Sequence, residues 1–359
     1  MTNDQLSFMV NIVKVRLRLK STIACLTTVS LAGCNAIDRF FAPTEPWLTP
    51  DELVVVVNQA DPLSVEIGNY YQQQRKIPQR NVISVNFAPN RVELSPEEFN
   101  QIKAAIEVQI PSYIQAYALT WAAPYRVGCM SITSAFALGF DPAYCAKGCQ
   151  LTKANPYFNH QTTQPFQDLQ IRPTIAIAAT HFEQAKALID RGIAADGTYP
   201  SGTAYLLSTS DNTRNVRAGL YPQVTQHLAS RFKTEVIQAD TLEHKTDVMF
   251  YFTGLAQVER IERNQFLPGA IADHLTSFGG MLTDSPQMSS LRWLEAGATG
   301  SYGNVVEPCN FPQKFPHPAV AMAAYLNGDT LLEAYWKSIA MPGQGIFIGE
   351  PLARPFSKF

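Results

Sequence analysis

A histidine beside an aspartate stands in residues 268–308, a stretch in which polar residues and glycines are dense between apolar runs. The imidazole of histidine has a pKa near neutral pH and is the commonest general acid or base in enzymes, often beside carboxylates and hydroxyls. We therefore take Asp273 and His274 as candidate catalytic residues. Neighbouring groups that would assist them are Thr276, Ser277, Asp284 and Glu307.

The local backbone decides what this pair can do. Adjacent residues of a strand point to opposite faces, so Asp273 and His274 form no dyad if the segment is extended. In a helix they would share an edge. The alternative to catalysis is a His274 whose hydrogen bonds are structural. Thr276 and Arg126 are also candidate binding residues, since an arginine can hold an anionic group bidentately; a surface ion pair is the alternative for Arg126.

The cysteines indicate disulfides more than metal binding. Downstream of the N-terminal segment the sequence has Cys129, Cys145, Cys149 and Cys309, which allow three pairings that the sequence does not distinguish. A bridge between Cys145 and Cys149, or one to Cys129, is the simplest expectation. A zinc site would need Cys-x2-Cys spacing and a second pair. No metal and no cofactor is therefore predicted.

The N-terminus has the pattern of an export signal. Basic residues between Lys14 and Lys20 precede a short apolar run, and Leu31-Ala32-Gly33-Cys34 has the form of a lipobox. The apolar run is too short to span the hydrocarbon core of a bilayer. We expect residues 1–33 to be a lipoprotein signal peptide, Cys34 to be lipidated with palmitate, and residues 34–51 to be a tether. An ordinary secretory signal is the alternative.

The remaining segments alternate between apolar strands and capped helices. Buried strands are expected at residues 53–57, 82–87, 117–122, 174–179, 203–208, 248–252, 298–306 and 346–348. Helices are expected after Asp61, after Ser95 and after Thr180, near 212–232, and at 318–326 and 329–339. Residues 129–172 lack periodicity and read as a long excursion containing cysteines. This alternation predicts one α/β domain, residues 52–356, built as a three-layer sandwich around a mostly parallel central sheet.

Composition and missing motifs remove several function classes. A formal charge of -2 and the absence of a Lys/Arg block downstream of the N-terminal segment disfavour nucleic-acid binding. There is no G-x-G-x-x-G, no P-loop, no G-x-S-x-G and no H-E-x-x-H string. Open α/β sheets bind ligands beyond the carboxyl ends of their strands, so a site is expected there. The residues at the expected strand ends are Asn58 and Asp61, Pro124 to Arg126, Thr180 and His181, Ser208 to Asp211, Thr253 and Gly254, Asp273 to Ser277, and Glu307.

Five stretches in order resemble an uncharacterised family of secreted bacterial proteins from genomes that carry exosortase, an enzyme that sorts proteins toward an exopolysaccharide-associated surface. They are VVVNQADPLSVEIGNYYQQQRKIPQRNVI, LIDRGIAADG, LPGAIADHLTSFGG, GATGSYGNVVEPC and IFIGEPLARPF. The resemblance covers about Val54 to Phe356 and implies a setting without a reaction. The family's closing Gly-Asp-Pro-Leu is here Gly349-Glu350-Pro351-Leu352, which keeps the carboxylate.

A more distant similarity is to caspase-like cysteine peptidases of the gingipain type, which implies a caspase-like sandwich. In that order a strand ends in Gly-His and a later strand ends in the catalytic cysteine. Here Leu255 follows Gly254, and Gly269 to Ser277 contains no cysteine. A thiolate nucleophile needs both a sulfur and an activating base. Cys309, beyond the next strand, would be a displaced nucleophile at most.

The sequence thus favours a lipid-anchored cell-envelope protein, on the periplasmic or outer-membrane side. We expect a binding or accessory protein of an exopolysaccharide-associated surface system, whose partners are the membrane and an envelope protein or glycan. A hydrolase with a His/carboxylate site around Asp273 and His274, assisted by a metal or not, is the alternative, and a purely structural envelope protein is a third hypothesis.

Overall fold

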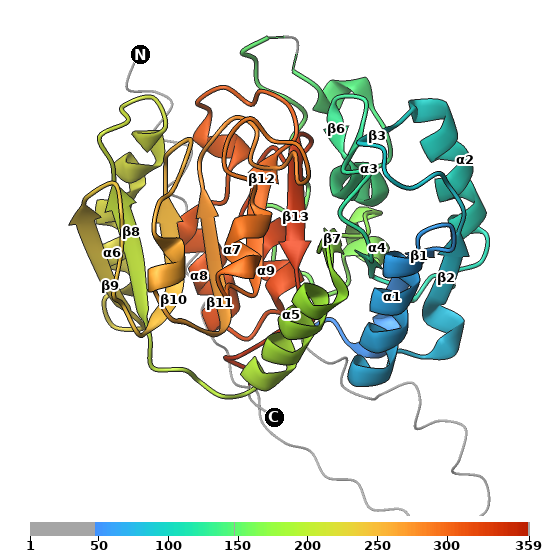
Figure 1. Cartoon of the computed structure of the whole chain (residues 1–359), viewed down its shortest axis with the longest axis horizontal. Coiled ribbons are helices and arrows are strands. Elements are labelled where there is room, and N and C mark those ends of the chain that lie inside the picture. The colour runs from blue at the N-terminus through green and yellow to red at the C-terminus, as the bar shows by residue number, and fades with distance from the viewer. Residues whose placement is uncertain (1–46, 147, 358–359) are drawn as a thin grey trace, which may run out of the picture. The chain divides into compact units, whose positions relative to one another are not determined.

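The computed structural model describes residues 47–146 and 148–357. The main sheet has the spatial order β2-β1-β4-β7-β13-β12-β11-β10-β8-β9 (Figure 1). In chain order its strands are β1 (Leu53–Asn58), β2 (Val82–Val85), β4 (Ala116–Leu119), β7 (Thr174–Ala176), β8 (Thr203–Ser208), β9 (Lys233–Gln238), β10 (Val248–Thr253), β11 (Phe266–His274), β12 (Gly300–Asn304) and β13 (Gly345–Gly349).

The sheet is mostly parallel, as predicted. Neighbours within the groups β2-β1-β4-β7 and β12-β11-β10-β8-β9 pair in parallel, whereas β13 runs antiparallel to β12. Ile348 of β13 lies opposite Ala176 of β7 and joins the two groups. A small second sheet contains β3 (Glu93–Leu94), β5 (Arg126–Val127) and β6 (Met130–Ser131).

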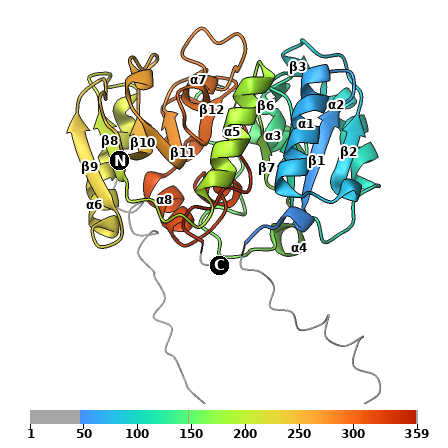
Figure 2. The same ribbon diagram turned by 60° about the horizontal axis from the view of Figure 1, so that its bottom comes forward.

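Helices cover both faces of the main sheet, which makes three layers. Its helices are α1 (Pro62–Arg75), α2 (Pro96–Glu107), α3 (Ile132–Leu138), α4 (Pro165–Leu169), α5 (Phe182–Ala195), α6 (Tyr221–Leu228), α7 (Leu291–Glu295), α8 (Pro318–Leu326) and α9 (Leu331–Lys337). The helices α1, α5 and α7 share one face, and Figure 2 shows α1 beside α5. On the other face α6 packs on α8, and α8 on α9. No helix among the described residues is long and apolar enough to cross a bilayer.

Two glycines of β12 let these layers approach the sheet closely. A Cβ on Gly300 would lie 2.7 Å from the Leu331 side chain of α9, and one on Gly303 would lie 2.4 Å from the Ser290 hydroxyl beside α7. Because residues three apart in a strand face opposite sides, each glycine serves one face. The glycine-spaced segment is therefore a close-packing strand.

Both groups of parallel strands end at the same edge of the sheet, which we call the carboxyl edge. Tyr125, beyond the end of β4, donates from its hydroxyl to Asp284, beyond the end of β11, at 2.6 Å. At the opposite, amino edge, Arg75 at the end of α1 pairs with Asp196 at the end of α5. Strand β13 runs in reverse and delivers Glu350 to this amino edge, where Arg75 binds it at 2.6 Å.

Some elements differ from the sequence-based expectation. The excursion 129–172 contains helix α3, six of whose seven residues are buried, so its sequence shows no polar face and no period. The expected helix near 212–232 is the 3-10 helix η6 (Asn215–Leu220) followed by α6. Strand β9 is not predicted from the sequence, and strand β11 is predicted only through its end at Asp273 and His274. Strand β1 is fully buried, as predicted, although it lies next to the edge strand β2.

Candidate functional site

Asp273 and His274 end strand β11 and face opposite layers of the sandwich. The segment is extended, so the alternation of side chains separates the two residues. Asp273 points toward η6, where the Arg217 Nη1 lies 2.5 Å from its Oδ1. His274 points toward α7 and contacts Trp293. The two side chains therefore form no acid–base dyad.

His274 is a structural residue in this arrangement. Its Nδ1 accepts from the Trp293 indole at 2.9 Å, and its Nε2 donates to the Met288 carbonyl at 3.1 Å. The side chain is buried. Burial lowers the pKa of His274 to about 3, because the cation would lose its hydration. Neither ring nitrogen is available to a ligand, so the structure does not support the candidate role of His274 as a general base.

The buried Asp273–Arg217 pair holds η6 onto the sheet. Arg217 also donates to the Thr253 carbonyl of β10 at 2.8 Å. Burial raises the pKa of Asp273 to about 6, and the Arg217 guanidinium opposes that shift. The carboxylate is thus ionised at neutral pH and paired. Asp273 links β10, β11 and η6, and it does not line the cavity described next.

A cavity of about 270 Å³ opens at the carboxyl edge, beyond the ends of β11 and β12. Its lining contains one cation, one carboxylate, hydroxyls, an amide and a disulfide. The polar lining residues are Thr213, Arg214, Thr276, Ser277, Glu307, Asn310 and the Cys149–Cys309 bridge. The sequence-predicted residues Thr276, Ser277 and Glu307 therefore meet here, in the loops that follow β11 and β12.

Arg214 is fixed at the cavity by two neighbours. Its Nη1 pairs with Asp211 at 2.8 Å, and its Nε donates to the Thr276 hydroxyl at 3.3 Å. Thr276 in turn donates to the Gln287 side-chain oxygen at 2.7 Å. A guanidinium held in this way is preorganised for an anionic or oxygen-rich ligand.

Glu307 supplies the opposite charge to the lining of the same cavity. Its Oε1 accepts from the backbone N–H of Cys309 at 2.7 Å, and the residue is exposed. A carboxylate accepts hydrogen bonds from hydroxyl or amide donors. The cavity thus offers both a charged donor and a charged acceptor, which suits a hydroxylated ligand with an acidic group.

All cysteines among the described residues are oxidised. Cys129 bridges to Cys145, and Cys149 bridges to Cys309. The first pairing is one of the alternatives expected from the sequence, whereas a bridge between Cys145 and Cys149 is not formed. The second ties the excursion to the loop after β12, at the cavity. A disulfide sulfur carries no thiolate, so Cys309 is not a nucleophile in this state.

The other predicted residues lie away from the cavity. Asp284 accepts from Tyr125, and Arg126 of β5 pairs with Glu93 at 2.7 Å. Arg126 therefore forms a surface ion pair. Cys34 lies outside the described residues. No group of three His, Cys, Asp or Glu side chains within the described ranges is placed to hold a metal ion.

Sequence reasoning missed Arg214 and Arg217. Both lie in a segment that had been read as the start of a helix after β8. The available signal was position: Ser208 to Asp211 had been placed at a strand end, and polar residues just beyond such an end face the carboxyl edge. A polar Asp-Asn-Thr-Arg run there was the clue to Arg214.

Comparisons with known proteins give a similarity of fold alone. No family model matches the chain, and no curated protein matches its sequence. The Arg-specific cysteine proteinase gingipain R (RgpB) aligns with a TM-score of 0.49 at 10% identity, over 85% of this chain and 78% of that one.

Two further solved structures show a weaker likeness. A complex of the pro- and mature domains of RgpB from Porphyromonas gingivalis gives a TM-score of 0.44 at 9% identity, over 84% of this chain and 79% of that one. A structure described only as a protease gives 0.41 at 10% identity, with coverage of 86% and 79%. Neither the gingipain-type architecture nor any activity is inferred for this chain from likenesses at this level. Membership in the exosortase-associated family stays a prediction.

Proposed function

We propose that this chain is a lipid-anchored cell-envelope protein that binds an acidic glycan of an exopolysaccharide-associated surface in the carboxyl-edge cavity. One observation carries the choice of binding over peptidase chemistry. The cavity gathers Arg214, Thr276, Ser277 and Glu307, but it contains neither a free thiol nor an accessible imidazole. Polar recognition groups are present, and the nucleophile and base of a cysteine peptidase are not in place there.

The alternative, a hydrolase around Asp273 and His274, gains no support. Both side chains are buried and engaged, Asp273 with Arg217 and His274 with Trp293. Neither lines the cavity. A general base must reach the proton that it abstracts, directly or through one water. These two residues are better explained as supports of the strand that carries Thr276 and Ser277.

The proposal is tested with two matched arginine variants of the full chain. Arg214→Ala removes the cavity guanidinium, whereas Arg126→Ala removes an arginine that is also partly exposed and ion-paired, but away from the cavity. The probes are alginate, an acidic polysaccharide, and dextran, a neutral one. A charge-assisted hydrogen bond contributes about 1.5–3 kcal/mol, so Arg214→Ala should weaken alginate binding about tenfold or more.

Arg126→Ala should bind alginate like the wild type, and dextran should bind more weakly than alginate to the wild type. Equal losses in both arginine variants would show that general surface charge binds the polysaccharide. Undiminished binding by Arg214→Ala, or no binding of either polysaccharide by the wild type, would overturn the proposed ligand.

A further inference from the structure

The amino edge of the sheet is where the described chain begins. Trp47 packs under the guanidinium of Arg354, with the Arg354 Cζ 4.3 Å from the ring centroid. Backbone bonds tie the same corner together: the N–H of Gly197 donates to the Arg354 carbonyl, and that of Tyr199 donates to the Pro355 carbonyl at 2.9 Å. Any segment ahead of Trp47 therefore joins the domain at this edge, opposite the cavity that contains Arg214.

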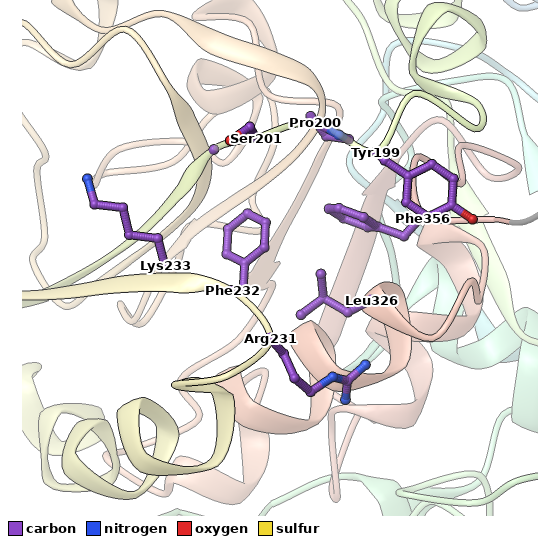
Figure 3. A pocket seen from close by; sticks show the side chains of 9 residues that line it. Tyr199, Pro200, Ser201, Arg231, Phe232, Lys233, Leu326 and Phe356 are labelled. Carbon is purple, nitrogen blue, oxygen red and sulfur yellow. The ribbon is translucent and has the colours of Figure 1, made fainter.

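An aromatic hollow of about 480 Å³ lies on the amino edge, next to this corner (Figure 3). It sits ahead of β8 and β9, and Tyr199, Phe232, Phe356 and Leu326 line it. The Phe232 and Phe356 rings meet edge to face at 5.9 Å, and Tyr199 meets Phe356 at 6.4 Å. Tyr199 is 47% exposed. The hollow is separate from the cavity at the carboxyl edge, and no residue lines both.

Further apolar side chains are exposed along the same edge. Val108 caps the end of α2 and is 86% exposed, and Tyr113 in the loop before β4 is 39% exposed. Scattered exposed apolar residues are ordinary. Here they stand in loops that precede parallel strands, as Tyr199 does, so they project from one edge.

Cations accompany the aromatic side chains. Arg231 and Lys233 line the hollow, and Arg80 donates to the Tyr113 hydroxyl at 3.1 Å. Lys233 pairs with Glu235, and both side chains are well exposed. Ion pairs between exposed side chains contribute little to stability, so Lys233 can exchange its partner for a phosphate group. Aromatic rings with nearby Lys and Arg are typical of surfaces that rest at a membrane interface.

We infer that the amino edge, defined by Tyr199, Val108 and Tyr113 with the hollow beside Trp47, is a membrane-contacting surface that rests on phospholipid headgroups. The inference depends on the proposed lipid anchor for its setting. The proposed anchor at Cys34 lies thirteen residues ahead of Trp47, so the amino edge is the part of the described domain that lies nearest the anchor along the chain. The cavity at the carboxyl edge then opens away from the lipid, toward the ligand.

The orientation of the protein on the membrane is measured with two variants of the full chain, each of which carries one added cysteine for a fluorophore. Ser201→Cys places a fluorophore on the exposed amino edge, and Thr283→Cys places one at an exposed position of the carboxyl edge. The protein is reconstituted with vesicles of phosphatidylethanolamine and phosphatidylglycerol that contain doxyl-labelled lipid, which quenches nearby fluorophores. We expect quenching at position 201 to exceed quenching at 283.

Two further sets of serine substitutions, each made in both labelled variants, test whether the exposed apolar residues of the amino edge cause the excess quenching at position 201. Tyr199→Ser combined with Val108→Ser should abolish the excess quenching at 201. Val236→Ser removes an apolar residue of the edge strand β9 that is about as exposed as Tyr199, and it should leave the excess quenching unchanged. Equal quenching at 201 and 283, or more at 283, would overturn the inference. So would excess quenching that survives the double substitution.

The proposed lipid anchor is tested separately from the proposed membrane-contacting surface. Sedimentation with vesicles that is lost in Cys34→Ser reports the anchor, whereas the quenching ratio is taken only from molecules that sediment. If Cys34→Ser sediments like the wild type, the anchor fails. The ratio of quenching at 201 and 283 still decides the orientation among those attached molecules.

Discussion

Replacing His274 by phenylalanine should destabilise the fold and leave ligand binding by folded molecules intact. The change keeps a flat ring in a fully buried position. It leaves the Trp293 indole N–H without its acceptor and the Met288 carbonyl without its donor. A buried polar group without its partner costs about 1–3 kcal/mol, so the free energy of unfolding should fall by about 3 kcal/mol at pH 7. His274→Ala should cost more, because it also opens a void.

The same variant should show a characteristic pH dependence. Burial lowers the pKa of His274 to about 3, whereas in the unfolded chain it lies near 6.5. Below pH 6.5 the unfolded wild type binds a proton that the folded protein does not. Its stability therefore falls by about 1.4 kcal/mol per pH unit, a loss that His274→Phe lacks. The difference in stability between the two proteins should shrink from about 3 kcal/mol at pH 7 to about 1 kcal/mol at pH 5.

Urea denaturation of both proteins between pH 5 and 7.5 measures this difference. Burial raises the pKa of Asp273 to about 6, so its protonation stabilises the folded state as the pH falls. That effect is present in both proteins and cancels when they are compared. A His274→Phe variant that unfolds like the wild type but loses alginate binding would refute the structural role assigned to His274.

Three further predictions concern the core, the amino edge and the anchor. Val56→Asp should lower the free energy of unfolding by several kcal/mol, since Val56 of β1 is fully buried; a variant with unchanged melting temperature would contradict its place in the core. Glu350→Gln should cost about 3–5 kcal/mol in urea denaturation, because it leaves the Arg75 charge poorly compensated where Glu350 accepts bonds at 2.6 and 2.9 Å; equal stability would show that Asp196 alone suffices. Palmitate labelling should disappear in Cys34→Ser, and its persistence would rule out the lipobox reading.

The sequence predicted the strands that are buried on both faces. Strands β1, β8 and β10 lie within a residue or so of the predicted runs, because a continuous run of β-branched and aromatic residues is typical of a strand that is buried on both faces. Strand β9 was missed because its sequence KTEVIQ is half polar, as suits an edge strand. The end of strand β11 was predicted at Asp273 and His274, but its beginning was missed because the Pro-Gly pair near its start is typical of a turn.

The sequence located the region of the site better than its residues. It placed polar groups at strand ends, and Thr276, Ser277 and Glu307 do line the cavity. It did not indicate on which face His274 lies, because that depends on the register of β11 and on Trp293, which is distant in sequence. The disulfide partners were equally hidden, since the Cys149–Cys309 bridge joins residues 160 positions apart.

The absence of thiol chemistry at the cavity is tested most directly with an electrophilic peptide inhibitor, such as a peptidyl acyloxymethyl ketone. The full chain is incubated with it without reductant, and intact mass and peptide mapping report any adduct. We expect no adduct at Cys309, because this sulfur is bound to Cys149. An adduct at Cys309 that disappears in Cys309→Ala, together with peptide hydrolysis that the same change abolishes, would contradict it.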